Sequence, residues 1–264
     1  MKLPVKNVIL LFITCFSFSF VSAQKQLNIE IDYSFGFVKS KVLDEWDNAM
    51  IYDGSKFQPF NLNFKFESQR WMHRVNFYYT KNKLNAFTGE DLFSYNYVNN
   101  ESDELSYDVL YKFYLSENKM FYMFGGVGIH AFGSFRHRET LSKNYPFEDI
   151  ADSYDVNSGS FQIVLSPNYQ IKQHFFCLTF STGVLNYVTR PDSYNSRYSS
   201  NHGKWYYDSY NKHFNLLSVF EYKRNISKNF LISTKYRFLY YSYSFPYKLK
   251  VLNQNYLLGL VYKL

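Results

Sequence analysis

The sequence predicts an all-β fold, a closed antiparallel up-and-down transmembrane β-barrel of about ten strands. Three observations predict it: apolar and polar residues alternate along most of the chain, Phe, Trp and Tyr make up 22% of the 264 residues, and short connections alternate with long ones. Alternation with a period of two sends successive side chains to opposite faces of a sheet. So high an aromatic content excludes a disordered chain.

Residues 1–23 are predicted to be a secretory signal peptide. Two lysines precede an apolar stretch that ends in small residues, which places the cleavage between Ala23 and Gln24. Removal of the signal lowers the net charge from +7 to +5, and the remaining 24–264 form one barrel domain. The alternatives are an uncleaved signal anchor and a lipoprotein attached through Cys15.

The mature chain keeps a single cysteine, Cys177, so an intramolecular disulfide is excluded. An exported chain without disulfides must be held together by packing and backbone hydrogen bonds. We expect Cys177 to face the interior as a small side chain. The positive charge is scattered along the chain and forms no stripe, which argues against nucleic-acid binding.

Ten segments carry the alternation, and each predicts one strand. In order along the chain they are 27–37, 60–67, 71–79, 105–115, 120–135, 161–171, 176–184, 214–222, 230–240 and 256–264.

The first segment sets the pattern, since Leu27, Ile29 and Ile31 alternate with polar residues. The second, third and fourth repeat it with aromatic and aliphatic residues at alternating positions. The fifth is apolar on both faces and holds four glycines, which we expect to leave room for large neighbours. Pro167 in the sixth predicts a bulge or a frayed pairing. The last four return to simple alternation.

The connections differ in length at the two ends of the predicted sheet. Short ones fall at 68–70, 116–119, 172–174 and 225–229, and long ones at 41–58, 81–103, 137–158, 188–213 and 242–250. Short periplasmic turns and long outer loops are typical of outer-membrane barrels.

Charged residues avoid one face of the predicted strands, on which only His73 can carry a charge. A Lys or Arg facing lipid near the midplane costs about 2–4 kcal/mol, so this face is predicted to meet lipid. The other face is predicted to form an ionic network in the lumen, made of Glu30, Asp32, Lys65, Glu67, Arg74, Asp108, Lys112, Glu221, Lys235 and Arg237. The alternative is a secreted soluble barrel or sandwich whose apolar face points inward.

Aromatic residues near the strand ends are predicted to form girdles at the two membrane interfaces. They are Trp71, Tyr79, Tyr187, Tyr241 and Tyr262.

The C-terminal segment resembles that of small bacterial outer-membrane β-barrel proteins. Gly259 is followed by Tyr262 and Leu264 at the spacing of the signal that the barrel-insertion machinery reads, although Leu257 stands where a polar residue is usual and Leu264 replaces the common terminal Phe. The resemblance implies a Gram-negative outer membrane, with its lipid and the insertion machinery as partners.

A ten-stranded barrel is narrow, and unpaired charges inside it are costly. We therefore expect the acids and bases of the lumen to pair and to plug it. Glu30 and Asp32 on the first strand are expected to meet Lys235 and Arg237 on the ninth, because closure brings these strands near each other.

The sequence predicts no cofactor, no metal site and no enzymatic activity. The alternative is a lipid hydrolase or acyltransferase at the outer rim, with His130, Ser134, His137 and Glu139 as candidates. Along one strand His130 and Ser134 lie roughly 13 Å apart, so another strand would have to supply a catalytic partner.

The outer loop 188–213 is rich in aromatic residues, which give a large contact area at a low entropic cost. The candidates for recognition of a surface glycan or protein are Tyr194, Tyr198, Trp205, Tyr206, Tyr207 and Tyr210. The alternative is that the aromatic composition of the chain simply extends into its loops. The predicted function is a non-enzymatic structural or surface-interaction barrel, and the alternative is a narrow porin-like channel or carrier for small or apolar solutes.

Overall fold

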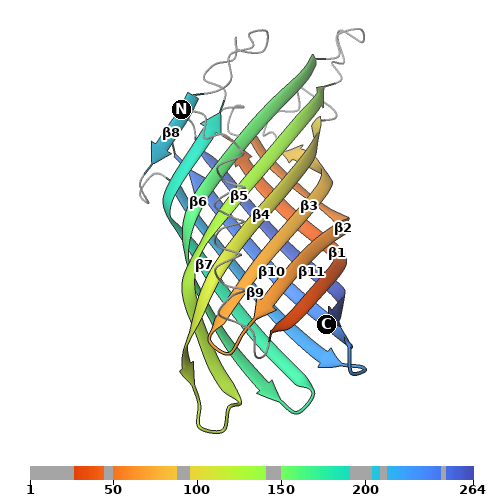
Figure 1. Ribbon diagram of the computed structural model, residues 1–264. Coiled ribbons are helices and arrows are strands. Elements are labelled where there is room, and N and C mark those ends of the chain that lie inside the picture. The colour runs from red at the N-terminus through yellow and green to blue at the C-terminus, as the bar shows by residue number, and fades with distance from the viewer. Residues whose placement is uncertain are drawn as a thin grey trace.

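The computed structural model describes residues 27–44, 50–87, 96–140, 150–190, 204–208, 213–244 and 248–264. They form an eleven-stranded antiparallel sheet (Figure 1). The strands are β1 (Asn28–Asp44), β2 (Met50–Glu67), β3 (Trp71–Phe87), β4 (Asn96–Leu115), β5 (Phe121–Thr140), β6 (Ile150–Ile171), β7 (His174–Arg190), β8 (Lys204–Asp208), β9 (His213–Asn225), β10 (Phe230–Tyr243) and β11 (Leu249–Lys263).

Ten of these strands close into a ring. Each long strand pairs with its neighbour in the chain, and β1 pairs with β11 from Glu30–Lys263 to Asp44–Leu249, which joins the two ends of the sheet. The short β8 pairs with the outer end of β7, while β9 pairs with the rest of β7. Figure 1 shows that the strands are tilted relative to the barrel axis, as a closed barrel requires. The predicted fold class is confirmed.

The strands run well beyond the predicted segments, and the predicted long loops are correspondingly wrong in extent. β4, β5 and β6 have 20, 20 and 22 residues, whereas about 9–11 tilted residues cross a bilayer. The outer extensions carry more Lys, Asn, Ser and Asp than the membrane part, so their alternation is weaker in sequence. Pairing to the neighbouring strand, as between Asn96 and Thr140, keeps them extended.

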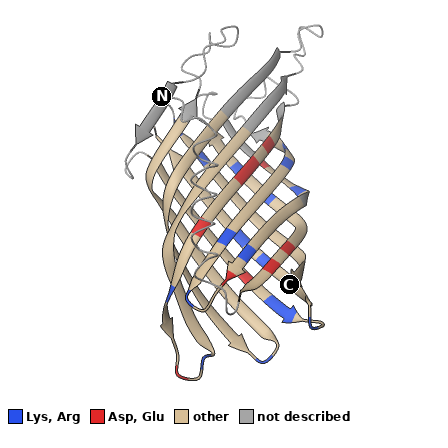
Figure 2. Ribbon diagram, in the orientation of Figure 1, with Lys and Arg blue, Asp and Glu red and all other residues tan. Residues whose placement is uncertain are grey.

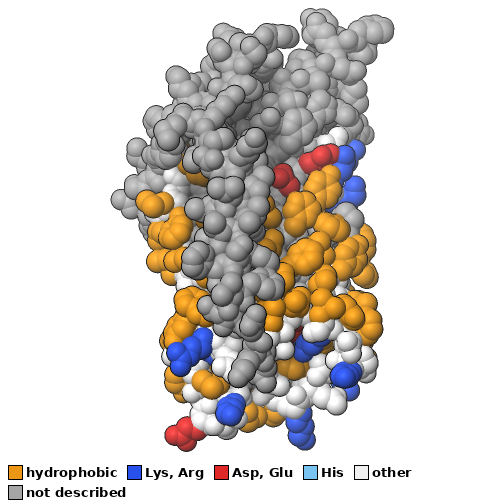
Figure 3. Space-filling model, in the orientation of Figure 1, with side chains coloured by type: hydrophobic (Ala, Val, Ile, Leu, Met, Phe, Trp, Pro, Cys, Tyr) orange, Lys and Arg blue, Asp and Glu red, His pale blue; other side chains and the backbone are white. Residues whose placement is uncertain are grey.

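The apolar face of the sheet points outward. Phe37, Leu185 and Ile163 are 63%, 70% and 54% exposed, and Figure 3 shows a broad apolar belt on the side of the molecule that it displays. An exposed apolar belt of this size is unfavourable in water and is typical of a surface that contacts the hydrocarbon core of a membrane. This orientation rules out a soluble barrel with its apolar face inside. Among the described residues, no helix is long and apolar enough to cross a membrane.

One predicted girdle residue is wrongly placed. Tyr241 is only 2% exposed and faces the lumen, because it shares the inward face of β10 with Lys235 and Arg237. Trp71 and Tyr262 do face outward near the short turns.

Local irregularities agree with the proline and glycine signals. Pairing between β6 and β7 is interrupted beside Pro167, where Asn168 instead donates a side-chain hydrogen bond to the carbonyl of Ser166 at 2.7 Å. Gly128 faces the lumen, and a Cβ there would overlap the carboxylate of Asp108. The fifth segment therefore uses this glycine to admit a charged neighbour.

Candidate functional site: the filled lumen

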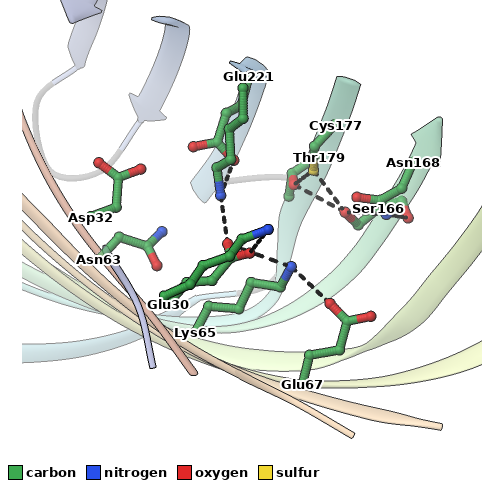
Figure 4. Close-up of polar contacts among 12 residues, drawn as sticks. Glu30, Asp32, Asn63, Lys65, Glu67, Ser166, Asn168, Cys177, Thr179 and Glu221 are labelled. Carbon is green, nitrogen blue, oxygen red and sulfur yellow. Dashed lines mark hydrogen bonds and ion pairs between the residues drawn. The ribbon is translucent and has the colours of Figure 1, made fainter. Parts of the chain in front are cut away.

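The lumen holds a cluster of ion pairs near the end with the short turns. Glu30 on β1 accepts a hydrogen bond from Lys223 at 2.9 Å, and Lys65 and Lys263 lie 3.8 and 3.6 Å from the same carboxylate. Lys65 also pairs with Glu67 at 2.7 Å. Figure 4 shows these side chains converging from opposite walls of the barrel. One carboxylate therefore bridges strands β1, β2, β9 and β11.

The ion pairs continue toward the middle of the barrel. Lys235 lies 2.7 Å from Asp32 and 3.4 Å from Glu221, and Glu221 also pairs with Lys223 at 3.1 Å. Space for this chain is left by Gly259, since a Cβ there would lie 2.9 Å from a carboxylate oxygen of Asp32. The charges thus form a continuous chain across the seam where the barrel closes.

On the opposite wall, Arg74 of β3 forms a separate pair with Asp108 of β4. Its Nε and Nη2 atoms donate to one carboxylate oxygen at 2.9 and 2.7 Å, and its Nη1 donates to the hydroxyl of Thr179 at 2.9 Å. The arginine therefore reaches across the lumen from β3 to β7.

A third group lies farther toward the outer end. Glu104 on β4 pairs with Arg237 on β10 and lies 3.0 Å from Nε2 of His130. The guanidinium of Arg237 stacks on the ring of Tyr78 at 4.3 Å, and the hydroxyl of Tyr78 donates a hydrogen bond to Asn255. These side chains span the full width of the lumen. Figure 2 shows charged positions along the whole coloured part of the barrel wall, with several close together near its middle.

The outer part of the lumen holds a group of apolar side chains among small polar ones such as Ser40 and Asn82, and the prediction of a polar interior missed the apolar group. Phe132 packs against Tyr241 with ring centroids 5.5 Å apart, and His213 lies edge-on to Tyr241 and Tyr243. We call the following buried set the outer apolar cluster: Val42, Leu84, Val156, Val188, Tyr241, Tyr243, Leu249 and Val251.

A second apolar group lies at the other end, on the wall formed by β3 to β6. It contains Met72, Leu110, Phe124 and Val164. Lys112 lies 5.0 Å from the centroids of Phe124 and of the neighbouring Tyr122, and its ammonium group also approaches Glu67 at 3.4 Å. The base is thus held by a carboxylate and two aromatic faces.

An internal cavity of about 100 Å³ remains among the charged groups. Water occupies roughly 30 Å³ per molecule, so this space holds only a few waters. Its lining includes Glu30, Arg74, Glu104, Lys235 and Arg237. The lumen is therefore packed with side chains along most of its length.

The structure places all ten predicted lumen residues on the inner face, and it pairs Asp32 with Lys235 as closure suggested. Glu30 and Arg237 do not meet the partners expected for them, because they pair with Lys223 and Glu104 instead. Sequence reasoning missed Glu104, Lys223, Lys263 and His130 as members of the network. Glu104 and Lys223 continue the period of two just past the segments 105–115 and 214–222, whereas His130 and Lys263 lie inside the fifth and tenth segments. In all four cases the phase of the alternation is the signal that would have found them.

Of the residues considered for catalysis, the structure describes the side chains of His130 and Ser134, and these two have different partners. Ser134 donates a hydrogen bond to Asn100 at 3.1 Å, while His130 faces Glu104. His137 and Glu139 lie on the outer extension of β5, where their side chains are outside the described set. Among the described residues, no group of three or more His, Cys, Asp or Glu side chains is arranged to hold a metal ion. Cys177 lines the cavity, 3.4 Å from the hydroxyl of Ser166.

Two histidines sit on the outward face, where the sequence indicated one. Nδ1 of His73 lies 2.9 Å from the hydroxyl of Tyr107, and Nδ1 of His174 lies 2.8 Å from that of Tyr222. In both pairs the rings stack, so a tyrosine partners each imidazole at the lipid-facing wall.

Several predicted features fall outside the described residues. They include the signal peptide with its cleavage site at Ala23 and Gln24, and the loop residues Tyr194, Tyr198 and Tyr210. The remaining aromatic residues of the loop lie in β8. Their backbones pair with β7, Trp205 with Thr189, Tyr206 with Val188 and Tyr207 with Tyr187. Part of the predicted loop is therefore a strand.

No protein-family model matches the chain, and comparison with curated proteins gives no match. Solved structures do resemble it. The outer membrane protease OmpT from Escherichia coli aligns with a TM-score of 0.54 at 10% identity, over 91% of this chain and 97% of that one. The translocator domain of the autotransporter NalP from Neisseria meningitidis aligns with a TM-score of 0.46 at 7% identity, over 97% and 95%.

The attachment invasion locus protein Ail of Yersinia pestis aligns with a TM-score of 0.36 at 13% identity, over 89% of this chain and 98% of that one. At such low identities these likenesses concern the fold. The alignment with OmpT, the closed ring of strands and the outward apolar belt together show that the chain has the fold of the bacterial outer-membrane β-barrel proteins.

Proposed function

We propose that the protein is a non-enzymatic, non-conducting barrel of the outer membrane that holds an extended outer part at the cell surface. The observation that carries the proposal is the filling of the lumen by two different layers. Ion pairs such as Glu104–Arg237 cross its middle, and the outer apolar cluster occupies its outer end. These two layers support a lumen without a continuous path for hydrated solutes.

The length of the strands supports a role on the outer side. β4, β5 and β6 continue for about ten residues beyond what a bilayer needs, and β8 adds a further strand to the end of β7. At about 3.4 Å per residue, these extensions raise a rigid β-structure above the membrane. The barrel then acts as the anchor, and the aromatic loop 188–213 is the candidate contact region for a surface glycan or protein.

The first test is electrical. Purified mature protein inserted into a planar bilayer is expected to give no large, stable conductance. A steady porin-like current would contradict the proposal and would favour the alternative, a narrow channel or carrier.

The second test concerns the loop. A variant in which Tyr194, Tyr198, Trp205, Tyr206, Tyr207 and Tyr210 are replaced by Ser is expected to insert normally but to lose binding of whole cells to a glycan array or to one another. Binding equal to that of the unaltered protein would remove the recognition role and leave only the structural one.

A further inference from the structure

Exposed charges at the end with the short turns are almost all positive. Among the described residues of this rim, the exposed bases are Arg70, Lys119, Lys172, Arg224 and Lys228, against a single exposed acid, Glu117. Figure 3 shows such basic side chains at the lower edge of the apolar belt. Each of the four turns between strands carries at least one base, so the positive charge follows the rim of the barrel.

Each turn cation also lies beside a pair of aromatic rings on the outer wall. Arg70 adjoins Trp71, whose ring is 5.0 Å from that of Tyr111, and Lys119 precedes Phe121, whose ring is 5.8 Å from that of Tyr114.

The other two turns repeat the arrangement. Lys172 lies in the chain between Tyr169 and Phe176, whose ring centroids are 6.4 Å apart. Lys228 precedes Phe230, whose ring centroid is 5.1 Å from that of Tyr262. Aromatic rings prefer the boundary between hydrocarbon and headgroups, so the cations stand at headgroup height.

Two of these lysines occupy backbone conformations that do not suit them. Lys119 has φ = 57° and Lys172 has φ = 53°, and they are the described non-glycine residues with positive φ. Glycine or asparagine normally fills such turn positions, because a Cβ is crowded there. A turn that only had to reverse the chain would be better served by glycine, so the lysine side chains have a use of their own.

Two of the cations face one hollow. A groove of about 670 Å³ between the turn at 68–70 and the turn at 116–120 has Arg70, Lys119 and Gln69 in its lining, together with Tyr111 and Tyr114. Glu67 and Lys112 also line it, and the carboxylate of Glu67 is paired with Lys65 and Lys112. The groove joins basic and amide donors to an aromatic and aliphatic wall that is continuous with the apolar belt.

We propose that this groove binds the phosphate of an anionic phospholipid in the periplasmic leaflet, with the other turn cations holding similar lipids around the rim. The acyl chains lie along the apolar belt, the aromatic pair meets the interfacial region, and Arg70 and Lys119 reach the phosphate. A soluble acidic protein would satisfy the cations but would leave the aromatic pairs at the same height without a purpose. Anionic headgroups attract such basic residues with an energy that corresponds to about a fivefold change in affinity per cation.

The fluorescence of Trp71 reports on this site. In a Trp46→Phe/Trp205→Phe background, the protein is placed in vesicles that contain brominated phosphatidylglycerol or brominated phosphatidylcholine as a quencher. We expect phosphatidylglycerol to quench Trp71 at several-fold lower mole fraction. The Arg70→Gln/Lys119→Gln variant is expected to remove the preference, whereas Lys39→Gln/Lys41→Gln, at the far end of β1, leaves it unchanged.

The glycine variant separates binding from turn geometry. Lys119→Gly is expected to keep or raise the thermal unfolding temperature in detergent, because it relieves the positive φ, and yet to weaken the preference for phosphatidylglycerol about fivefold. An unchanged preference in Lys119→Gly and in the double glutamine variant would overturn the proposal. Displacement of the lipid by inorganic phosphate, at an ionic strength matched with chloride, would also overturn it by showing a soluble-anion site.

Discussion

At the scale of single residues, the interior contains buried charges that each require a partner of opposite charge. Arg74 and Asp108 are 13% and 4% exposed in their side chains, and the arginine has its partners on two other strands. A buried ion pair adds little over a well-packed apolar pair, but removal of one member leaves the other uncompensated. Such a pair therefore adds little stability of its own, but each member requires the other to be present.

Loss of one member of the pair should therefore destabilise the protein more than replacement of both members. Asp108→Ala is expected to lower the free energy of unfolding by about 3 kcal/mol, whereas Arg74→Met/Asp108→Leu recovers most of that loss. Urea unfolding in lipid vesicles measures both. The exposed pair Lys81–Glu101 is the matched control, since Glu101→Ala should cost under about 1 kcal/mol. A double variant as unstable as the single one would show that the pair itself is stabilising.

At the scale of elements, single strands change character along their length while keeping their period of two. The inward positions of β10 run from Ser233 through Lys235 and Arg237 to Leu239 and Tyr241. The phase of the alternation, and hence the inward or outward direction of most side chains, was predictable from sequence, although Tyr241 was assigned to the wrong face. The change from ionic to apolar side chains in the lumen was not predicted. An inward apolar residue resembles a lipid-facing one in sequence unless the alternation is followed along the whole strand.

Pairings across the lumen were less predictable than directions. Asp32 and Lys235 sit on strands separated in the ring only by β11, so closure alone brings them together. Glu104 and Arg237 lie on distant walls, and their contact depends on the width of the barrel and on the stagger of its strands. Those two quantities follow from the complete set of registers and not from any local pattern.

Strand β1 offers a prediction at this scale. A Cβ on Gly36 would overlap the backbone carbonyl of Tyr256 in β11, beside the register shift between β1 and β2. Gly36→Ala should therefore cost about 1–3 kcal/mol of stability through overpacking at the closing seam. Gly133→Ala is the control, because its nearest neighbour is the carboxylate of the exposed Asp103, which can turn away. Equal unfolding midpoints for the two variants would contradict this account.

At the scale of the whole molecule, the barrel is an inverted globule whose apolar belt faces outward and whose charges face its axis. The outer apolar cluster departs from this inversion and makes the outer end of the lumen resemble an ordinary protein core. Under the proposed function the lumen is closed twice, once by the outer apolar cluster and once by the ion pairs. The two closures lie in series along one axis.

Because the two layers lie in series, variants of one layer and of both layers should differ in planar-bilayer conductance. Leu84→Ala/Tyr241→Ala/Tyr243→Ala removes the bulk of the outer apolar cluster but leaves Glu104–Arg237 and the chain from Asp32 to Glu30 in place, so planar-bilayer conductance should stay near zero. Glu104→Ala/Arg237→Ala removes an ion pair from the middle layer and leaves the cluster, so it should also stay closed. The five substitutions together should give a larger ion current than either set alone, because the outer apolar cluster and the ion pair between the distant strands β4 and β10 are then both absent. If the three outer substitutions alone open the barrel, the ionic layer is permeable and the protein is a gated channel whose apolar cluster is the gate.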